Sequence, residues 1–214
     1  RTVLAERGVI REVERRPDME VLYGTETVTT VHESGIRYRL DPTKVMFSSG
    51  NFDEKLRMAS LDCRGETVVD MFAGIGYFTL PLAAKAGADR VIACEINPEA
   101  VRFLRENVEL NRVGDRVSIF EGDNRDLPGE GFADRVVMGY VNVTWQFLPK
   151  AFSLVRKGGV VHYQDTCSID SIPDRLIEKV RVGSGGRPFE IIGVREIKAY
   201  APSISHMVVD VRAL

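Results

Sequence analysis

The sequence of 214 residues has little that would tie it to a membrane, a metal or a disulfide framework. No apolar stretch approaches the ~20 residues of a membrane helix, and the first residues lack the apolar core of a secretory signal. Cysteine occurs only three times, at Cys63, Cys94 and Cys167, without a C-x-x-C pair, which argues against disulfides and structural zinc. We therefore expect a cytoplasmic protein without a metal site or a membrane partner.

The sequence also has no excess of basic charge. Lys and Arg number 29 against 31 Asp and Glu, a net charge of -2, so no global positive field marks a nucleic-acid partner. Local clusters, Arg11 with Arg15 and Arg16 and then Arg37 with Arg39, could contact phosphates or lie on solvated faces. If RNA binds through its phosphates, its affinity should fall steeply as the salt concentration rises.

After residue 66, short β-branched runs alternate with helical periodicity, which is typical of a parallel sheet covered on both faces. The predicted strands span residues 67–72, 90–95, 116–121, 134–140 and 159–165. The predicted helices span residues 77–86, 98–112, 143–157 and 172–182, the third of them closed by Gly158-Gly159. Two final runs are too closely joined for a helix and predict an antiparallel hairpin over 189–199 and 205–211.

A smaller unit precedes this α/β pattern. Its alternating runs predict a small antiparallel β-sheet with strands at 9–13, 19–31, 36–40 and 45–47. A helix over 52–61 then joins it to the rest. We thus divide the chain into a β subdomain (1–47), a linking helix region (48–66) and a ligand-binding α/β domain (67–214). No pattern indicates an obligate protein partner.

The segment Val68–Phe78 is the most informative part of the sequence, because a β-branched strand ends there in Asp70 and a glycine turn. Gly74 and Gly76 lack a Cβ atom, so a ligand can approach bare backbone. The dinucleotide fingerprint needs a third glycine three residues later, where this chain has Thr79. The turn therefore favours an S-adenosylmethionine pocket over a nicotinamide or flavin site. The alternative is a glycine turn that serves only the packing of the strand against the helix.

Polar side chains also follow the next two strands. Glu95 ends the second strand, where it can accept hydrogen bonds from ribose hydroxyls. Asp123 and Asn124 follow the third strand and offer the acceptors and amide donors that an adenine edge requires. Each acid alone is common in turns. Because the carboxyl ends of parallel strands meet at one edge of a sheet, the groups together predict one nucleoside site.

Longer segments carry a resemblance to a known family. They are Tyr23–Val28, Gly35–Asp41, Met46–Ser48, Asp70–Gly76, Asp123–Asp126, Asp134–Val141, Lys198–Pro202 and His206. In these segments the sequence resembles the archaeal-type tRNA wybutosine-synthesizing protein 2 family, aminocarboxypropyl transferases related to the tRNA guanosine methyltransferases that act beside the anticodon. Members usually carry a further amino-terminal RNA-binding domain, so we expect residues 1–47 to be the remainder of a longer region.

The resemblance implies a class I methyltransferase (Rossmann-like) fold, S-adenosylmethionine as the group donor and the anticodon region of tRNA(Phe) as the partner. The 3-amino-3-carboxypropyl group would move to a tricyclic guanosine derivative on the 3' side of the anticodon, with release of methylthioadenosine. Carried-over and inferred donor contacts are Ser48, Lys55, Phe72, Ala73, Gly74, Gly76, Glu95, Ile96, Asp123, Asn124 and Gly139. Two further residues would position the reacting groups, Tyr140 and Asn51.

Several of these residues have a structural alternative. Ser48 and Asn51 could cap the predicted helix 52–61, and Lys55 could be a solvated residue of that helix. Tyr140 could be a core aromatic rather than a stacking platform for a base. The three histidines gain no catalytic assignment, because His162 and His206 lie in predicted strands and His32 in the small predicted sheet, where a satisfied structural histidine is common.

The sequence differs from related transferases at positions that bear on the reaction. Methyltransferases that modify ring or exocyclic nitrogens usually hold the nitrogen with an Asn- or Asp-Pro-Pro turn, where this chain has Gly139-Tyr140-Val141. Related sequences also tend to have histidine where this chain has Trp145 and Gln164. Three alternatives stay open: a tRNA guanine-N1 methyltransferase, a catalytically silent cofactor- and RNA-binding module, and a small-molecule transferase.

Overall fold

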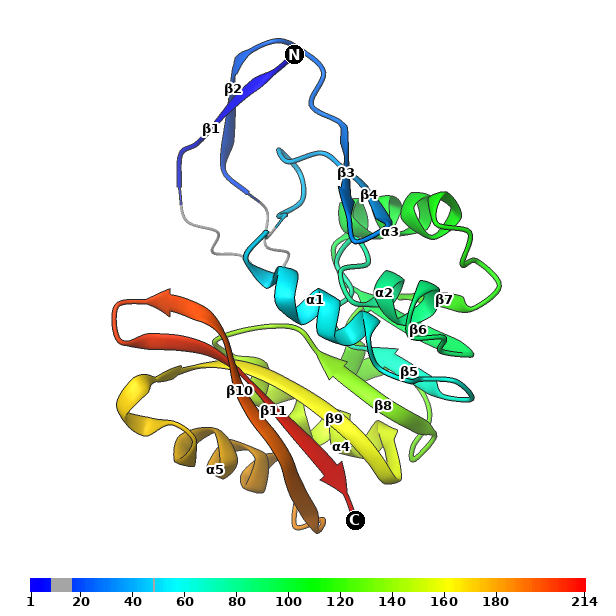
Figure 1. Cartoon of the computed structure of the whole chain (residues 1–214), viewed down its shortest axis with the longest axis vertical. Coiled ribbons are helices and arrows are strands. Elements are labelled where there is room, and N and C mark those ends of the chain that lie inside the picture. Colours follow the sequence, from blue (N-terminus) through cyan, green and yellow to red (C-terminus); the bar gives the residue numbers. More distant parts are fainter. Residues whose placement is uncertain (9–16, 48) are drawn as a thin grey trace.

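A computed structural model of the chain describes residues 1–8, 17–47 and 49–214 (Figure 1). The strands of its main sheet are β5 (Thr67–Asp70), β6 (Arg90–Glu95), β7 (Val117–Glu121), β8 (Ala133–Met138), β9 (Val155–Ser168), β10 (Phe189–Ala201) and β11 (Ile204–Ala213). Their order is β10-β11-β9-β8-β5-β6-β7, with β5 to β9 parallel to one another and β10 and β11 antiparallel. The predicted fold class, a mostly parallel sheet with an antiparallel carboxy-terminal hairpin, is confirmed.

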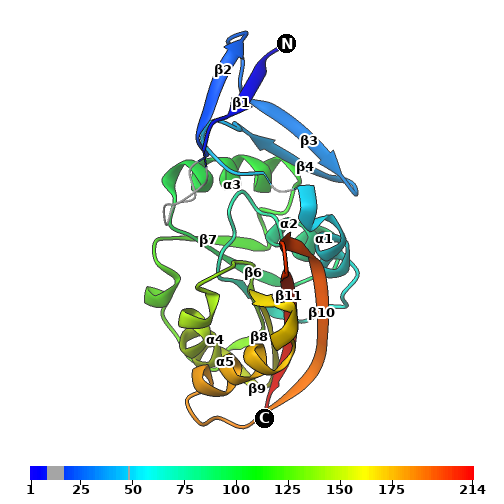
Figure 2. The same ribbon diagram turned by 90° about the vertical axis from the view of Figure 1, so that its left-hand side faces the viewer.

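Helices cover both faces of this sheet. They are α1 (Phe52–Ala59), α2 (Thr79–Ala84), α3 (Pro98–Leu110), α4 (Leu148–Leu154) and α5 (Asp174–Gly183). Because side chains alternate along a strand, Val68 of β5 joins one buried cluster with residues of α1, α2 and α3, and Val69 joins another with residues of α4 and α5. Figure 2 shows these helices around the sheet. Among the described residues, no helix is long and apolar enough to span a membrane.

Two separate two-stranded antiparallel sheets precede α1, where the sequence predicted one small sheet. Their strands are β1 (Val3–Glu6) with β2 (Met19–Tyr23), and β3 (Thr29–Glu33) with β4 (Ile36–Leu40). The side-chain amides of Asn107 on α3 and of Asn111, which follows α3, bond the backbone of β4, where their Oδ1 atoms accept from Arg39 N at 2.6 Å and Arg37 N at 2.9 Å. These bonds fix the β3–β4 hairpin on the α/β unit.

Two strand predictions in this amino-terminal part are wrong. The run 19–31 is interrupted because Gly24 turns the chain with a φ of 84° between β2 and β3. Residues 45–47 form no strand, since this apolar run packs toward the interior and the cavity described below. The predicted strand 9–13 lies outside the described residues.

A third local prediction is wrong at the end of α4. The helix predicted to reach residue 157 ends at Leu154, and Gly158-Gly159 lie within β9 instead of closing the helix. Gly159 runs so close to β8 that a Cβ atom there would lie 2.8 Å from the Asp134 carbonyl oxygen. These glycines therefore serve the irregular start of the β8–β9 pairing, where the register shifts.

Candidate active site

A cavity of about 460 Å³ lies at the carboxyl ends of β5, β6, β7 and β8. Of the residues predicted for the site, those that line it are Asn51, Lys55, Phe72, Gly74, Glu95, Ile96, Asp123, Asn124, Gly139 and Tyr140. Ala73 and Gly76 do not line it, and Ser48 lies outside the described residues. Among the described residues, no group of three His, Cys, Asp or Glu side chains could hold a metal ion.

The glycine turn after β5 is held by the buried carboxylate of Asp70. Its Oδ2 accepts from the Thr79 hydroxyl at 2.8 Å, and its Oδ1 from the Phe72 N–H at 3.3 Å. Thr79, which replaces the third glycine of the dinucleotide fingerprint, thus serves as the anchor of the turn. Burial raises the pKa of Asp70 to about 6, because the hydrogen bonds from neutral groups offset only part of the cost of burying its charge.

The two glycines of this turn have different surroundings. Gly74 has a φ of 57°, and a Cβ atom there would meet the Tyr77 ring at 2.6 Å. Its N–H donates to Glu95 at the cavity surface. A Cβ on Gly76 would lie 2.8 Å from Leu80 Cγ, so this residue serves helix packing rather than the cavity.

Three backbone N–H groups position the carboxylate of Glu95. Its Oε2 accepts from Gly74 N at 2.7 Å, and its Oε1 accepts from Ile96 N at 2.9 Å and Asn97 N at 2.8 Å. Three N–H donors therefore fix the carboxylate at the end of β6, beside the cavity. An ionised carboxylate can only accept hydrogen bonds, which suits the hydroxyls of a ribose.

Asp123 and Asn124 follow β7 and differ in their partners. Asn124 Nδ2 donates to the Met71 carbonyl at 2.7 Å, whereas its buried Oδ1 has no hydrogen-bond partner among the described residues. Asp123 accepts from Arg125 Nε at 2.9 Å, and this hydrogen bond lowers its pKa. We call Glu95, Ile96, Asp123 and Asn124 the nucleoside end of the cavity.

An aromatic wall joins β5 to the loop after β8. Tyr140 stacks on Phe72 with ring centroids 4.9 Å apart and an interplanar angle of 14°, and Phe147 meets Phe72 edge-on at 5.0 Å. Tyr140 is half-buried in the cavity lining and is not a core residue. The preceding Gly139 packs so tightly that a Cβ atom would lie 2.4 Å from the Phe78 ring.

Another part of the lining comes from α1 and the β10–β11 hairpin. We call this set the tail end of the cavity: Asn51, Lys55, Lys198, Tyr200 and His206. Asn51 precedes α1 but makes no side-chain cap, and its buried Oδ1 has no hydrogen-bond partner among the described residues. Lys55, a predicted donor contact, forms an ion pair with Glu33 and so already has an acidic partner.

The sequence prediction assigned no role to Lys198, Tyr200 or His206. All three lie more than 100 residues from the glycine turn and reach the cavity only because β11 pairs with β9. Their one signal was that Lys198–Pro202 and His206 belong to the segments of the family resemblance. Of the other histidines, His32 is exposed and His162 is bonded to Asp210 at 2.6 Å.

Comparisons with known proteins agree with this geometry. Residues 29–191 match the family model of the TRM5/TYW2 methyltransferase domain. The tRNA(Phe) (4-demethylwyosine(37)-C(7)) aminocarboxypropyltransferase of Pyrococcus horikoshii is 45% identical over 214 residues, which are 99% of this chain and 76% of that protein.

Solved structures show the same relationship. The crystal structure of Methanocaldococcus jannaschii TYW2 in complex with AdoMet has a TM-score of 0.85 and 42% identity, and covers 92% of this chain and 91% of that one. The complex structure of aTrm5 and tRNALeu has a TM-score of 0.89 and 28% identity, and covers 100% of this chain and 61% of that one. The chain belongs to the TRM5/TYW2 methyltransferase domain family.

Proposed function

We propose that the chain transfers the 3-amino-3-carboxypropyl group of S-adenosylmethionine to a ring carbon of the tricyclic guanosine derivative 3' of the anticodon in tRNA(Phe). The observation that carries this proposal is the cavity wall after β8, which is formed by Gly139, Tyr140 and Val141. Methyltransferases with a nitrogen nucleophile usually have an Asn- or Asp-Pro-Pro turn at this position, and this wall lacks it. The P. horikoshii relative, whose name specifies C(7) of 4-demethylwyosine, supports the same choice.

The residues present fit the proposed donor. The cavity volume lies within the usual range for small-molecule sites. Glu95 would accept hydrogen bonds from the ribose hydroxyls, and Asn124 Oδ1, which has no hydrogen-bond partner among the described residues, would accept one from the adenine amine. Asp123 supplies a further acceptor, and the Gly74 turn leaves room beside them.

When bound, S-adenosylmethionine supplies a sulfonium whose three attached carbons are all electrophilic. The tail end then decides the outcome, because only the carbon held in line with the nucleophile reacts. Asn51 Oδ1 would accept from the ammonium of the donor tail, and Lys198 would pair with its carboxylate. Tyr140, stacked on Phe72, would position the acceptor base by offering it a flat aromatic face.

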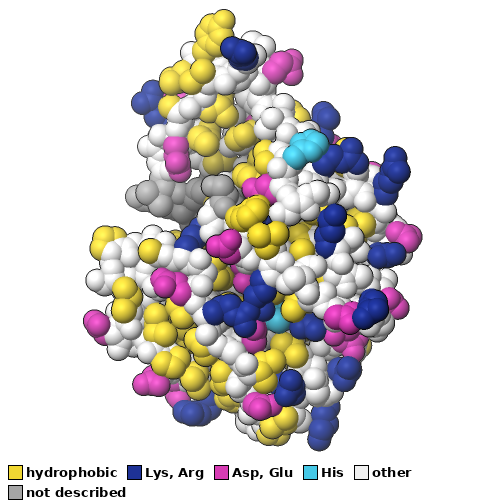
Figure 3. All heavy atoms as spheres, in the orientation of Figure 1, with side chains coloured by type: hydrophobic (Ala, Val, Ile, Leu, Met, Phe, Trp, Pro, Cys, Tyr) yellow, Lys and Arg dark blue, Asp and Glu magenta, His cyan; other side chains and the backbone are white. Residues whose placement is uncertain are grey.

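The proposed partner is the anticodon region of tRNA, with the cytoplasm as the site of action and no obligate protein partner. On the face of the molecule drawn in Figure 3, Lys and Arg side chains are interspersed with acidic ones. We therefore expect tRNA binding to depend on local phosphate contacts and to weaken steeply with salt. The aTrm5 neighbour, solved with tRNALeu, supports the assignment of an RNA partner.

Product analysis tests the proposal directly. The protein is incubated with labelled S-adenosylmethionine and tRNA(Phe) that carries the tricyclic precursor, and the nucleosides are identified by mass. We expect methylthioadenosine and an aminocarboxypropylated base. S-adenosylhomocysteine with methylated RNA would instead indicate the guanine-N1 methyltransferase. Binding without product would indicate a silent module, and turnover without RNA a small-molecule transferase.

A further inference from the structure

Two walls of the cavity meet at its tail end. One is α1, which carries Lys55 and is preceded by Asn51. The other is the β10–β11 hairpin, which carries Lys198. The segment just before α1 approaches the hairpin closely, because a Cβ atom on Gly50 would lie 2.6 Å from Lys198 Nζ. The shape of the tail end therefore depends on how α1 is placed against this hairpin.

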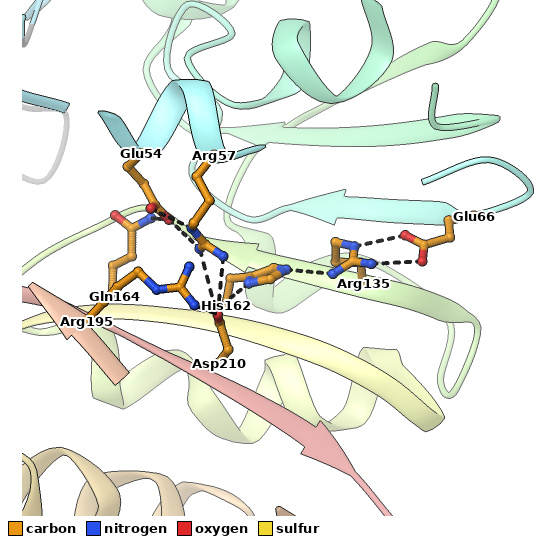
Figure 4. Close-up of polar contacts among 8 residues, drawn as sticks. All are labelled: Glu54, Arg57, Glu66, Arg135, His162, Gln164, Arg195 and Asp210. Atoms are coloured by element: carbon orange, nitrogen blue, oxygen red, sulfur yellow. Dashed lines mark hydrogen bonds and ion pairs between the residues drawn. The ribbon is translucent and has the colours of Figure 1, made fainter. Parts of the chain in front are cut away.

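An ion cluster joins these walls outside the cavity lining (Figure 4). Arg57 of α1 is its centre, because its guanidinium donates both to Glu54 of the same helix, at 2.7 Å, and to Asp210 of β11, at 3.2 Å. Arg195 of β10 donates to the same Asp210 carboxylate at 2.7 Å. Gln164 of β9 donates to Glu54 at 3.2 Å, which adds a second link between α1 and the sheet.

The cluster continues through the sheet to β8 and the segment before β5. Arg135 Nη1 lies 2.9 Å from His162 Nε2, and since an arginine can only donate, this nitrogen accepts and Nδ1 donates to Asp210. Burial lowers the pKa of His162, in agreement with a neutral ring. At the far end, Arg135 makes two parallel bonds to Glu66, at 2.8 and 2.9 Å.

The centre of the cluster is buried, and its charges balance. The side chains of Glu54 and Asp210 are 2% and 7% exposed, and that of Arg57 is 17% exposed. Its three arginines face three acids, with a neutral histidine between them. Buried ion pairs add little stability compared with apolar packing, but removing one partner is costly. Such a cluster is therefore better suited to fixing one relative placement of its elements than to stabilising the fold.

The residues of α1 that join the ion cluster differ from the residues in and just before α1 that line the cavity. Glu54 and Arg57 are three residues apart and face the sheet ions, whereas Asn51 and Lys55 are four residues apart and line the cavity. We propose that Arg57 is a positioning residue, which holds α1 against the β10–β11 hairpin so that the tail end fits the amino-acid tail of the donor. This inference rests on the donor named under the proposed function.

The binding of two ligands distinguishes a specific role of Arg57 in placing the tail end from a general loss of rigidity of the protein. S-adenosylhomocysteine carries the amino-acid tail, whereas methylthioadenosine has the same adenosine without it. For R57M we expect the dissociation constant of S-adenosylhomocysteine to rise about tenfold and that of methylthioadenosine to change less than about twofold. R57K, which keeps the charge but not the forked geometry, should lie between R57M and the native protein. Isothermal titration calorimetry measures all of these constants.

K179M is the matched control. Lys179 of α5 is paired at 2.8 Å with Asp165, which is fully buried, and neither residue lines the cavity. This variant should lose thermal stability as R57M does, yet bind both ligands like the native protein. Equal weakening of both ligands in R57M, unchanged binding of both, or a tail-specific loss in K179M would overturn the inference.

If R57M does not fold, the isosteric D210N replaces it, because it removes the carboxylate charge to which Arg57 bonds between α1 and the hairpin. The same tail-specific loss is expected from D210N, and its absence would also overturn the inference. These measurements need no turnover. A failure of the proposed function would show in the products of the native protein, whereas a failure of this inference would show only in the ligand comparison.

Discussion

Asp70, at the turn beside the nucleoside end, and Asp210, behind the tail end, are both buried carboxylates but have opposite surroundings. Asp70 is bonded to a threonine hydroxyl and a backbone N–H, and burial raises its pKa to about 6. Burial alone would also raise the pKa of Asp210, but the His162 hydrogen bond and the charges of two arginines outweigh it and lower that pKa. One end thus rests on short-range neutral bonds, and the other on charges brought together from distant parts of the chain.

The largest expected effect of this difference is on the pH dependence of stability. Because the pKa of Asp70 rises from 3.8 to about 6 on folding, native stability falls as the pH rises from about 4 to about 6. That gap corresponds to about 3 kcal/mol. The unfolding free energy of D70N relative to the native protein should therefore increase by about this amount between pH 4 and pH 7, as measured by urea denaturation at each pH.

For D210N we expect the opposite dependence of stability on pH. The folded pKa of Asp210 is lowered, so its contribution is present above the unfolded pKa and is lost as the pH falls. The native protein should therefore gain stability relative to D210N as the pH rises through about 4. If the difference in unfolding free energy between variant and native protein changed with pH in the same direction for D70N and D210N, the surroundings of the two carboxylates would not shift their pKa values in opposite directions.

The nucleoside end could be predicted from the sequence because its residues lie close to the ends of recognisable strands. Asp70, Glu95 and Asn124 each follow a strand of a recognisable βαβ pattern, and the carboxyl ends of such strands meet at one edge. The sequence could not reveal that Lys55 is paired with Glu33 of β3, or that Val45 and Met46 line the cavity in a segment that forms no strand. Both depend on how the amino-terminal hairpin packs.

The next largest effect is expected at the nucleoside end. E95A removes the acceptor of three backbone N–H groups and the proposed ribose contact, so the dissociation constants of S-adenosylhomocysteine and methylthioadenosine should both rise about a hundredfold, or ~2.7 kcal/mol. Both ligands should weaken because both carry the adenosine. E121A is the control, since Glu121 ends the neighbouring β7 and pairs with Arg105 outside the cavity.

The tail end was less predictable for a physical reason. Arg57 and Asp210 are 153 residues apart in sequence, and periodicity gives no sign that two charged residues will be buried together. Charged residues on a helix and at the end of a strand are read as solvated. Lys198 and His206 likewise reach the cavity only through the antiparallel pairing of β11 with β9, which brings the end of the chain back to the sheet.

The smallest expected effect is at the tail end. Asn51 Oδ1 is buried without a hydrogen-bond partner among the described residues, and a single bond to the donor ammonium would be lost in N51A. The dissociation constant of S-adenosylhomocysteine should rise about fivefold, or ~1 kcal/mol, and that of methylthioadenosine should not change. S60A, which removes the bond from Ser60 Oγ to the Arg57 carbonyl at the other end of α1, should leave both constants unchanged. If N51A weakened methylthioadenosine as well, Asn51 would belong with Glu95 rather than with the tail end, and the division of the cavity into two ends would have to be redrawn.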